Sequence, residues 1–253
     1  MSSIYIACDI RVTAGGILVT DSAQKVFACK QRPEIYGYCG NAEYPPLVLR
    51  SLVAALANGA AWPAHAAAYE EPEWVGRFLS DKLRIVPGGP DYSNTVVVRG
   101  TRKGEGSVNA EFSIFKFYVS GSVWEWARLD LPAVSDVVVA EGSGADKVRA
   151  WRDYWTSAQG RRRTSRGVFS ALCGALRANA DPKSGGAPQL VGMYQEGPPA
   201  TFRVLFNGGR FVNGRAVPSA EAMLWHDDLF QVCDGELMKP LESAQRHRRP
   251  KGL

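Results

Sequence analysis

The sequence has few of the residues on which the best-known hydrolytic and metal sites depend. Its three histidines, at positions 65, 226 and 247, are too few and too scattered to suggest a Ser–His pair or a metal site. Its five cysteines are odd in number and include no C-x-x-C pair, which favours reduced, buried thiols over a disulfide framework or a zinc site. Any hydrolytic chemistry must therefore find its base elsewhere.

The sequence also lacks long apolar runs and a recognisable export signal. No run approaches the roughly 18–20 apolar residues that a membrane-spanning helix needs. The first residues, MSSIYIACD, carry no basic segment and reach an acid at Asp9. With 253 residues, 45% of them hydrophobic and 22% charged, the composition is that of a globular chain. We expect a soluble, cytoplasmic protein without a membrane partner.

Positive charge is in slight excess and is concentrated in two places. The net charge is +5, and much of it comes from an arginine cluster at 161–166 and a basic tail at 246–251. No zinc-finger spacing or ribonucleoprotein aromatic motif accompanies either cluster. A solvated loop and a solvated tail are therefore favoured, and nucleic acid is not expected as a partner.

The order of the expected elements indicates the fold class. Strand patterns occur at 4–8, 17–19, 25–28, 35–39, 95–98, 112–119, 123–127, 137–140, 189–194, 202–206 and 210–212. Helix patterns occur in two pairs, at 44–56 and 70–85 and at 145–155 and 165–179. A parallel sheet would alternate strand and helix one by one, so this order predicts an α+β fold with antiparallel sheets. We expect strands 4–8, 25–28 and 35–39 to share one sheet, with one helix pair on each side of the molecule.

The pattern of strands and helices stops near residue 214. Residues 1–214 are therefore predicted to form one domain. Residues 215–253 show no strong periodicity and end in the basic tail, so we interpret them as a C-terminal extension.

Five short motifs stand out, although each alone is typical of a turn or a helix cap. They are DIRVT at 9–13, Lys25, GYCG at 37–40, GSG at 142–144 and DPKSGG at 181–186. In order and spacing they resemble the proteasome-subunit family of N-terminal-nucleophile (Ntn) hydrolases, which includes bacterial proteasome-like peptidases. The resemblance spans residues 4 to 214. It implies a four-layer αββα sandwich, in which two antiparallel sheets are flanked by helix pairs.

The resemblance also implies a chemistry that needs no histidine. In that family an N-terminal Thr, Ser or Cys attacks a peptide carbonyl, and its own α-amino group, which titrates near pH 8, acts as the base. By the resemblance, Lys25 is the electrostatic activator and Asp9 pairs with it. Gly40 offers its backbone N–H to the oxyanion.

The remaining motif residues have implied roles beside the nucleophile and the substrate. Ser143, Asp181 and Ser184 form a hydrogen-bond network next to the nucleophile's amine, and Thr13 pairs with the backbone of an extended substrate. The substrate is a peptide or a protein, and no metal ion or other cofactor is expected. Members of the family commonly form homo-oligomeric rings, and an ATP-dependent unfoldase is a further partner that the resemblance leaves open.

The nucleophile is the feature that the sequence lacks. In the family it begins a strand that precedes the Asp-bearing strand, a position that falls upstream of Met1. Ser2 is the only N-terminal candidate, yet at about 3.3 Å per residue an extended strand would hold it about 20 Å from Asp9. Three readings stay open: a chain that continues upstream to a Thr, Ser or Cys, a catalytically silent structural subunit, and a rearranged N-terminus that brings Ser2 to the site.

Overall fold

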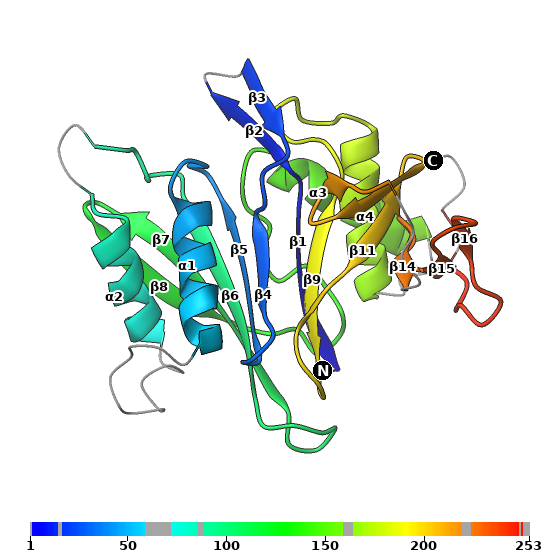
Figure 1. Ribbon diagram of the computed structural model, residues 1–253, viewed down its shortest axis with the longest axis horizontal. Helices are drawn as coiled ribbons and strands as arrows, with labels where there is room; N and C mark the ends of the chain where they lie inside the picture. The colour runs from blue at the N-terminus through cyan, green and yellow to red at the C-terminus, as the bar shows by residue number, and fades with distance from the viewer. Residues whose placement is uncertain are drawn as a thin grey trace.

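The computed structural model describes residues 2–14, 17–58, 72–85, 89–158, 164–218, 224–247 and 249. The architecture is a mixed α+β arrangement with several sheets (Figure 1). Nearly all strand pairs are antiparallel, as the order of elements predicted. No helix in the described ranges is long and apolar enough to cross a bilayer.

The largest antiparallel sheet runs in the order β4-β5-β6-β7-β8. Its strands are β4 (Val26–Cys29), β5 (Glu34–Cys39), β6 (Val96–Lys103), β7 (Glu111–Ser120) and β8 (Val123–Leu129). Helices α1 (Pro45–Asn58) and α2 (Pro72–Lys82) cover one face of this sheet (Figure 1).

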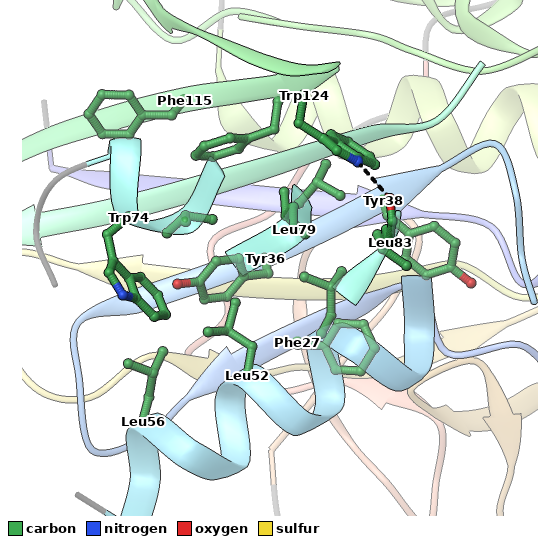
Figure 2. Packing of buried hydrophobic residues seen from close by; sticks show 14 of the residues in the cluster. Phe27, Tyr36, Tyr38, Leu52, Leu56, Trp74, Leu79, Leu83, Phe115 and Trp124 are labelled. Carbon is green, nitrogen blue, oxygen red and sulfur yellow. Dashed lines mark hydrogen bonds between the residues drawn. The ribbon is translucent and has the colours of Figure 1, made fainter. Parts of the chain in front are cut away.

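Apolar side chains from both helices and the sheet form the core between them. Figure 2 shows Leu52 of α1 and Leu79 of α2 against Tyr36 of the sheet. The indole Nε1 of Trp124 donates a hydrogen bond to the carbonyl oxygen of Leu83 at 3.2 Å, which fixes the end of α2 on β8. Burial of these side chains is the main force that holds the helix pair on the sheet.

A second sheet packs against the other face of the first. It contains β1 (Ser3–Cys8), β9 (Gln189–Tyr194) and β10 (Ala200–Thr201) in the order β1-β9-β10. Ile4 and Val191 from this sheet meet Val26 and Ile35 from the first sheet in one buried cluster. The two sheets therefore share an apolar core.

Helices α3 (Ala145–Ala158) and α4 (Ser165–Arg177) lie on the far side of the second sheet (Figure 1). Phe169 of α4 packs against Leu190 of β9. Within the helix pair, a side chain at Gly174 would meet the Trp151 ring at 2.7 Å, so this glycine allows the close approach of α3 and α4. As predicted, the two helix pairs lie on opposite sides of the molecule.

The chain after residue 200 builds a further sheet, in the order β13-β12-β11-β14-β15-β16. Its strands are β11 (Arg203–Phe206), β12 (Gly209–Val212), β13 (Arg215–Ala216), β14 (Trp225–His226), β15 (Val232–Asp234) and β16 (Lys239–Pro240). Trp225 and Cys233 bury their side chains against Leu205. The described part of the expected C-terminal extension is thus packed onto the rest of the chain through short strands.

Two details differ from the sequence-based expectations. Strand 4–8 does not share a sheet with strands 25–28 and 35–39, because its hydrogen-bonded neighbour is β9, far along the chain. It faces β4 and β5 across the apolar core instead. Residues 137–140 form no strand. Their apolar side chains line a groove beside β1 rather than a ladder of paired strands.

The fold makes stability depend on pH through His226. Its ring lies 5.0 Å from the Phe202 ring and 5.1 Å from the Phe230 ring, and burial lowers its pKa to about 4. The unfolded chain binds this proton near pH 6.5, so stability falls as the pH drops from about 6.5 to about 4, by up to about 3 kcal/mol. Urea unfolding at pH 7 and pH 4.5 measures this. In His226→Phe the pH-dependent loss in the free energy of unfolding should shrink by that amount. An unchanged loss would show that His226 is not the group responsible.

Candidate active site

An ion pair between Asp9 and Lys25 forms the centre of the candidate site. Asp9 follows the last residue of β1, and Lys25 precedes β4. The Lys25 Nζ lies 2.8 Å from Asp9 Oδ1 and 2.6 Å from the carbonyl oxygen of Arg11. Both residues are buried, with 8% of their surface exposed. The close ion pair expected from the sequence is therefore present.

The environment of Lys25 keeps the side chain charged. Burial by itself lowers the pKa of Lys25, but the neighbouring Cys8 and Asp9 together outweigh this effect, so the pKa is raised. Burial also raises the pKa of the neighbouring Cys8 thiol, which stays protonated at neutral pH. A lysine with a raised pKa is a poor base near pH 7. Lys25 can therefore act by its positive charge and not by taking a proton.

Asp9 is also fixed by backbone donors. Its Oδ2 accepts hydrogen bonds from the N–H groups of Gly185 at 3.0 Å and Arg11 at 3.1 Å. Three nitrogen donors thus hold one buried carboxylate, the arrangement that makes a buried charge tolerable.

Gln189 connects the strand ends that carry this ion pair. Its Oε1 accepts the Lys25 N–H at 3.0 Å, and its Nε2 donates to the carbonyl oxygens of Asp9 at 2.9 Å and Ala23 at 2.7 Å. The side chain is almost fully buried. Sequence reasoning missed this residue. The available signal was a lone polar residue at the start of the apolar strand QLVGMY.

A second cluster gathers around Asp181. Its Oδ2 accepts hydrogen bonds from Ser143 Oγ at 2.5 Å and Ser184 Oγ at 2.9 Å. Its Oδ1 accepts the Lys183 N–H at 3.1 Å. Burial raises the pKa of Asp181, but these hydrogen bonds outweigh it, so the pKa is lowered. The three residues expected from the motifs therefore converge around one carboxylate.

The loop after Asp181 joins the two clusters. Ser184 bonds to Asp181, and the next residue, Gly185, donates its N–H to Asp9. Arg11 also binds this loop, because its guanidinium donates a hydrogen bond to the carbonyl oxygen of Pro182 at 3.2 Å. The same guanidinium donates to both carboxylate oxygens of Asp21 at 2.9 Å. The motif contained Arg11, but sequence reasoning gave it no role.

Two further sequence candidates are Gly40 and Thr13. Gly40 has a φ of +96°, and a Cβ there would lie 2.3 Å from Asn94 O, so only glycine fits this turn. A Cβ on Gly142 would lie 3.5 Å from Cys39 Cβ, which places the GSG motif beside the Gly40 turn. Thr13 lies in β2 (Arg11–Ala14), which pairs with β3 (Ile17–Asp21).

Ser2 lies at the opposite end of β1 from Asp9. The register pairs Ser3 with Tyr194 and Cys8 with Gln189, so β1 is extended over its whole length. At about 3.3 Å per residue, Ser2 is about 20 Å from Asp9. The geometry therefore places Ser2 too far away to attack a carbonyl held at the ion pair.

A groove of about 400 Å³ runs along β1 and reaches the candidate site. Every residue from Ser2 to Asp9 lines it, and so do Asp181 and Ser184. Helices α3 and α4 and residues 132–141 form much of the remaining wall. The volume is in the range of pockets that hold a ligand.

No protein-family model matches the sequence, and no curated protein matches it. Among solved structures, the chain is similar to Anbu (ancestral beta-subunit) from Yersinia bercovieri, at 14% identity over 79% of this chain and 82% of that chain, with a TM-score of 0.47.

Two further structural neighbours are Anbu from Hyphomicrobium sp. strain MC1 and eukaryotic HslV from Trypanosoma brucei. For Anbu the identity is 13%, the coverage 78% and 82%, and the TM-score 0.44. For HslV the identity is 16%, the coverage 77% and 95%, and the TM-score 0.38. At these identities and TM-scores the likeness carries no argument about function, which has to be argued from the site itself.

Proposed function

We propose that the chain is a proteasome-like Ntn hydrolase that cleaves peptide or protein substrates with an N-terminal threonine-type nucleophile. In this proposal the two sheets and two helix pairs form the four-layer αββα arrangement over residues 1–214. The protein acts in the cytoplasm as a homo-oligomeric ring, with no cofactor. An ATP-dependent unfoldase is a further partner to test.

One observation carries this proposal. The Lys25–Asp9 pair and the Ser143–Asp181–Ser184 cluster are joined by the Gly185 N–H, and Asp9, Asp181 and Ser184 line the groove beside β1. A charged lysine next to a polar cluster at the end of a groove suits a nucleophile whose α-amine serves as its own base.

Each group has a role that follows from its contacts. Lys25 is held positive, so it lowers the pKa of a hydroxyl or amine placed beside it. Asp181 accepts hydrogen bonds from two hydroxyl groups, so its remaining acceptor capacity suits an ammonium or an amine N–H. The turn at Gly40 follows Cys39, which lines the groove, and we assign the Gly40 N–H to the oxyanion. Thr13 is assigned to the substrate backbone.

The nucleophile in this proposal begins a strand that lies antiparallel to β1. A hairpin with a two-residue turn at positions 1 and 2 would pair the preceding residue with Ser3. The residue opposite Asp9 is then about the seventh upstream of Met1, since antiparallel partners run in opposite directions. A Thr at this end of the strand lies beside Lys25.

A Thr-first form of the protein tests the proposal. It carries a Thr, about six apolar residues and an Asn-Gly turn ahead of Ser3, with the initiator methionine removed. We expect it to hydrolyse small fluorogenic peptide amides, because its α-amine and hydroxyl reach Lys25. We expect no turnover from the 253-residue chain, because Ser2 is too far away. Release of the fluorophore gives the rate.

Two controls make the result specific. The same extension with Ala in first place keeps the strand and removes the hydroxyl, so it should be inactive. The same extension with an acetylated Thr keeps the hydroxyl and removes the base, so it should be nearly inactive. Substantial hydrolysis by the 253-residue chain that is lost in Ser2→Ala would refute the strand assignment.

A catalytically silent structural subunit is the second candidate. It is favoured by the distance between Ser2 and Asp9. It is also favoured by the hydrogen bonds of Asp9, whose carboxylate accepts from Gly185 and Arg11 and whose carbonyl oxygen accepts from Gln189. Such contacts would preserve the Lys25–Asp9 pair without catalysis. A folded Thr-first protein that forms rings and shows no hydrolysis would support this candidate.

A further inference from the structure

Strand β1 has an open edge along the groove. Within the described part of the chain, its one hydrogen-bonded neighbour in the sheet is β9. In an antiparallel pair every second residue bonds to the partner, so the residues between them direct their N–H and C=O groups the other way, into the groove. An unpaired edge of this kind is a template for another strand.

The position of this edge between two layers is unusual. Ala7, near the end of β1, is exposed although the layers on both sides of β1 are packed. Ile6 and Cys8 are only half-buried while they contact the core between the sheets. The groove therefore extends from the surface into the interior of the fold.

The groove has two apolar walls. On the side of the first sheet it is lined by Val98 and Ile114, which belong to or pack against the core between the sheets. On the helix side it is lined by Val148 of α3 and by Val168 and Leu172 of α4. A strand beside β1 would thus have one face against the sheet and the other against the helices. Strands buried on both faces need apolar residues throughout.

We infer that this groove binds an extended polypeptide strand, apolar on both faces, which another polypeptide can supply in trans. The open edge of β1 provides the backbone hydrogen bonds, and the two walls select the side chains. The inference rests on the proposed function only in placing the first residue of that strand at the ion pair. An amphipathic strand with one polar face does not fit, because that face would be buried without partners.

Charge complementarity gives the direction of the bound strand. At the Asp9 end the groove is lined by Asp9 and Asp181, and Lys25 pairs directly with Asp9. Asp181 accepts its side-chain hydrogen bonds from neutral serine hydroxyls. A free ammonium is therefore favoured at this end, so the strand runs antiparallel to β1 with its N-terminus at the site.

Peptide binding to the 253-residue protein tests the inference. The probe is a fluorescent synthetic peptide of about nine residues, with a free N-terminus, consecutive Val and Ile residues and two C-terminal lysines that lie beyond Ser2. A second peptide has Lys and Glu at every other apolar position. We expect the first to bind with an affinity of about 10 µM or tighter and the second to bind at least about tenfold more weakly. Fluorescence anisotropy measures both.

Hydrogen exchange and protein variants locate the bound peptide. Binding should slow exchange at alternate amides between Ser3 and Cys8. Leu172→Asp places a charge in the helix wall and should weaken binding at least about tenfold. Leu237→Asp is the matched control, because Leu237 is 70% exposed and outside the groove, and it should bind as the unchanged protein does.

Three results would overturn the inference. They are no binding of the apolar peptide up to about 100 µM, equal binding of the half-polar peptide, and a dimer of the chain that occupies the groove and is not displaced by peptide. The proposed function is judged separately. If a peptide that begins with Thr binds in the groove and no hydrolysis of peptide amides follows, the strand-binding site is supported. The proposed catalytic function is then contradicted.

Discussion

In the Thr-first protein, Lys25→Ala should lower the rate of peptide-amide hydrolysis by about a hundredfold to a thousandfold. The Lys25 ammonium lies 2.8 Å from Oδ1 of Asp9, which lines the groove, and it is buried, so its charge is poorly screened. Without it, the amine and hydroxyl of the nucleophile return toward their solution pKa values, and each unit is worth about 1.4 kcal/mol.

A pH profile separates this electrostatic role from a structural one. The residual activity of Lys25→Ala should rise with pH through a midpoint near 8, the value of an ordinary α-amine, whereas the parent should show a lower midpoint. Lys30→Ala is the matched control, because Lys30 is exposed in the turn after β4 and should leave the rate unchanged. An equal loss in both variants, or no shift of the midpoint in Lys25→Ala, would contradict the assigned role.

Arg99→Met should destabilise the fold by about 3 to 5 kcal/mol. Arg99 is fully buried in the middle of β6, and its Nε lies 3.0 Å from Glu34 Oε2 on β5. Glu34 is also buried and accepts hydrogen bonds from Arg32 and Tyr36. Removal of Arg99 leaves that buried carboxylate with only the partly exposed Arg32 as an ion-pair partner, which costs more than the pair itself contributes.

Urea unfolding of three variants measures this effect. Arg149→Met is the matched control, because Arg149 and its partner Asp146 are exposed, and it should change stability by less than about 1 kcal/mol. The double variant Glu34→Gln and Arg99→Met should recover part of the loss, since neither charge is then buried. A loss below about 1 kcal/mol in Arg99→Met would show that the pair does not hold β5 and β6 together.

Arg99 also shows where sequence reasoning fell short on the fold. The apolar pattern at 95–98 predicted a strand that stops before Arg99, yet β6 continues to Lys103. A charged residue normally ends a buried strand pattern, and only its partner Glu34, distant in the sequence, explains the exception. The helices were easier, because amphipathic periodicity is local. Their observed ranges differ from the predicted ones by a few residues at the ends.

In the candidate site, too, residues marked by local sequence motifs could be predicted, and contacts between distant segments could not. Short motifs in the sequence indicated Asp9, Lys25, Ser143, Asp181 and Ser184. The structure pairs Lys25 with Asp9 and gathers the two serines around Asp181. Gln189 and the Gly185 N–H were missed, because their contacts with Asp9 join segments about 180 residues apart. The groove could not be predicted either, since it is formed by strand β1, two helices and residues 132–141 together.

Covalent trapping of the nucleophile tests the central claim most directly. A peptide β-lactone is added to the Thr-first protein, and the intact mass is measured. Attack by the Thr hydroxyl opens the lactone, forms an ester and releases no leaving group, so the mass should rise by that of one reagent molecule. Fragmentation should place the adduct on the first residue, and Lys25→Ala should form it at least about a hundredfold more slowly. A folded Thr-first protein that gains no mass, or gains it elsewhere in the chain, would contradict the account.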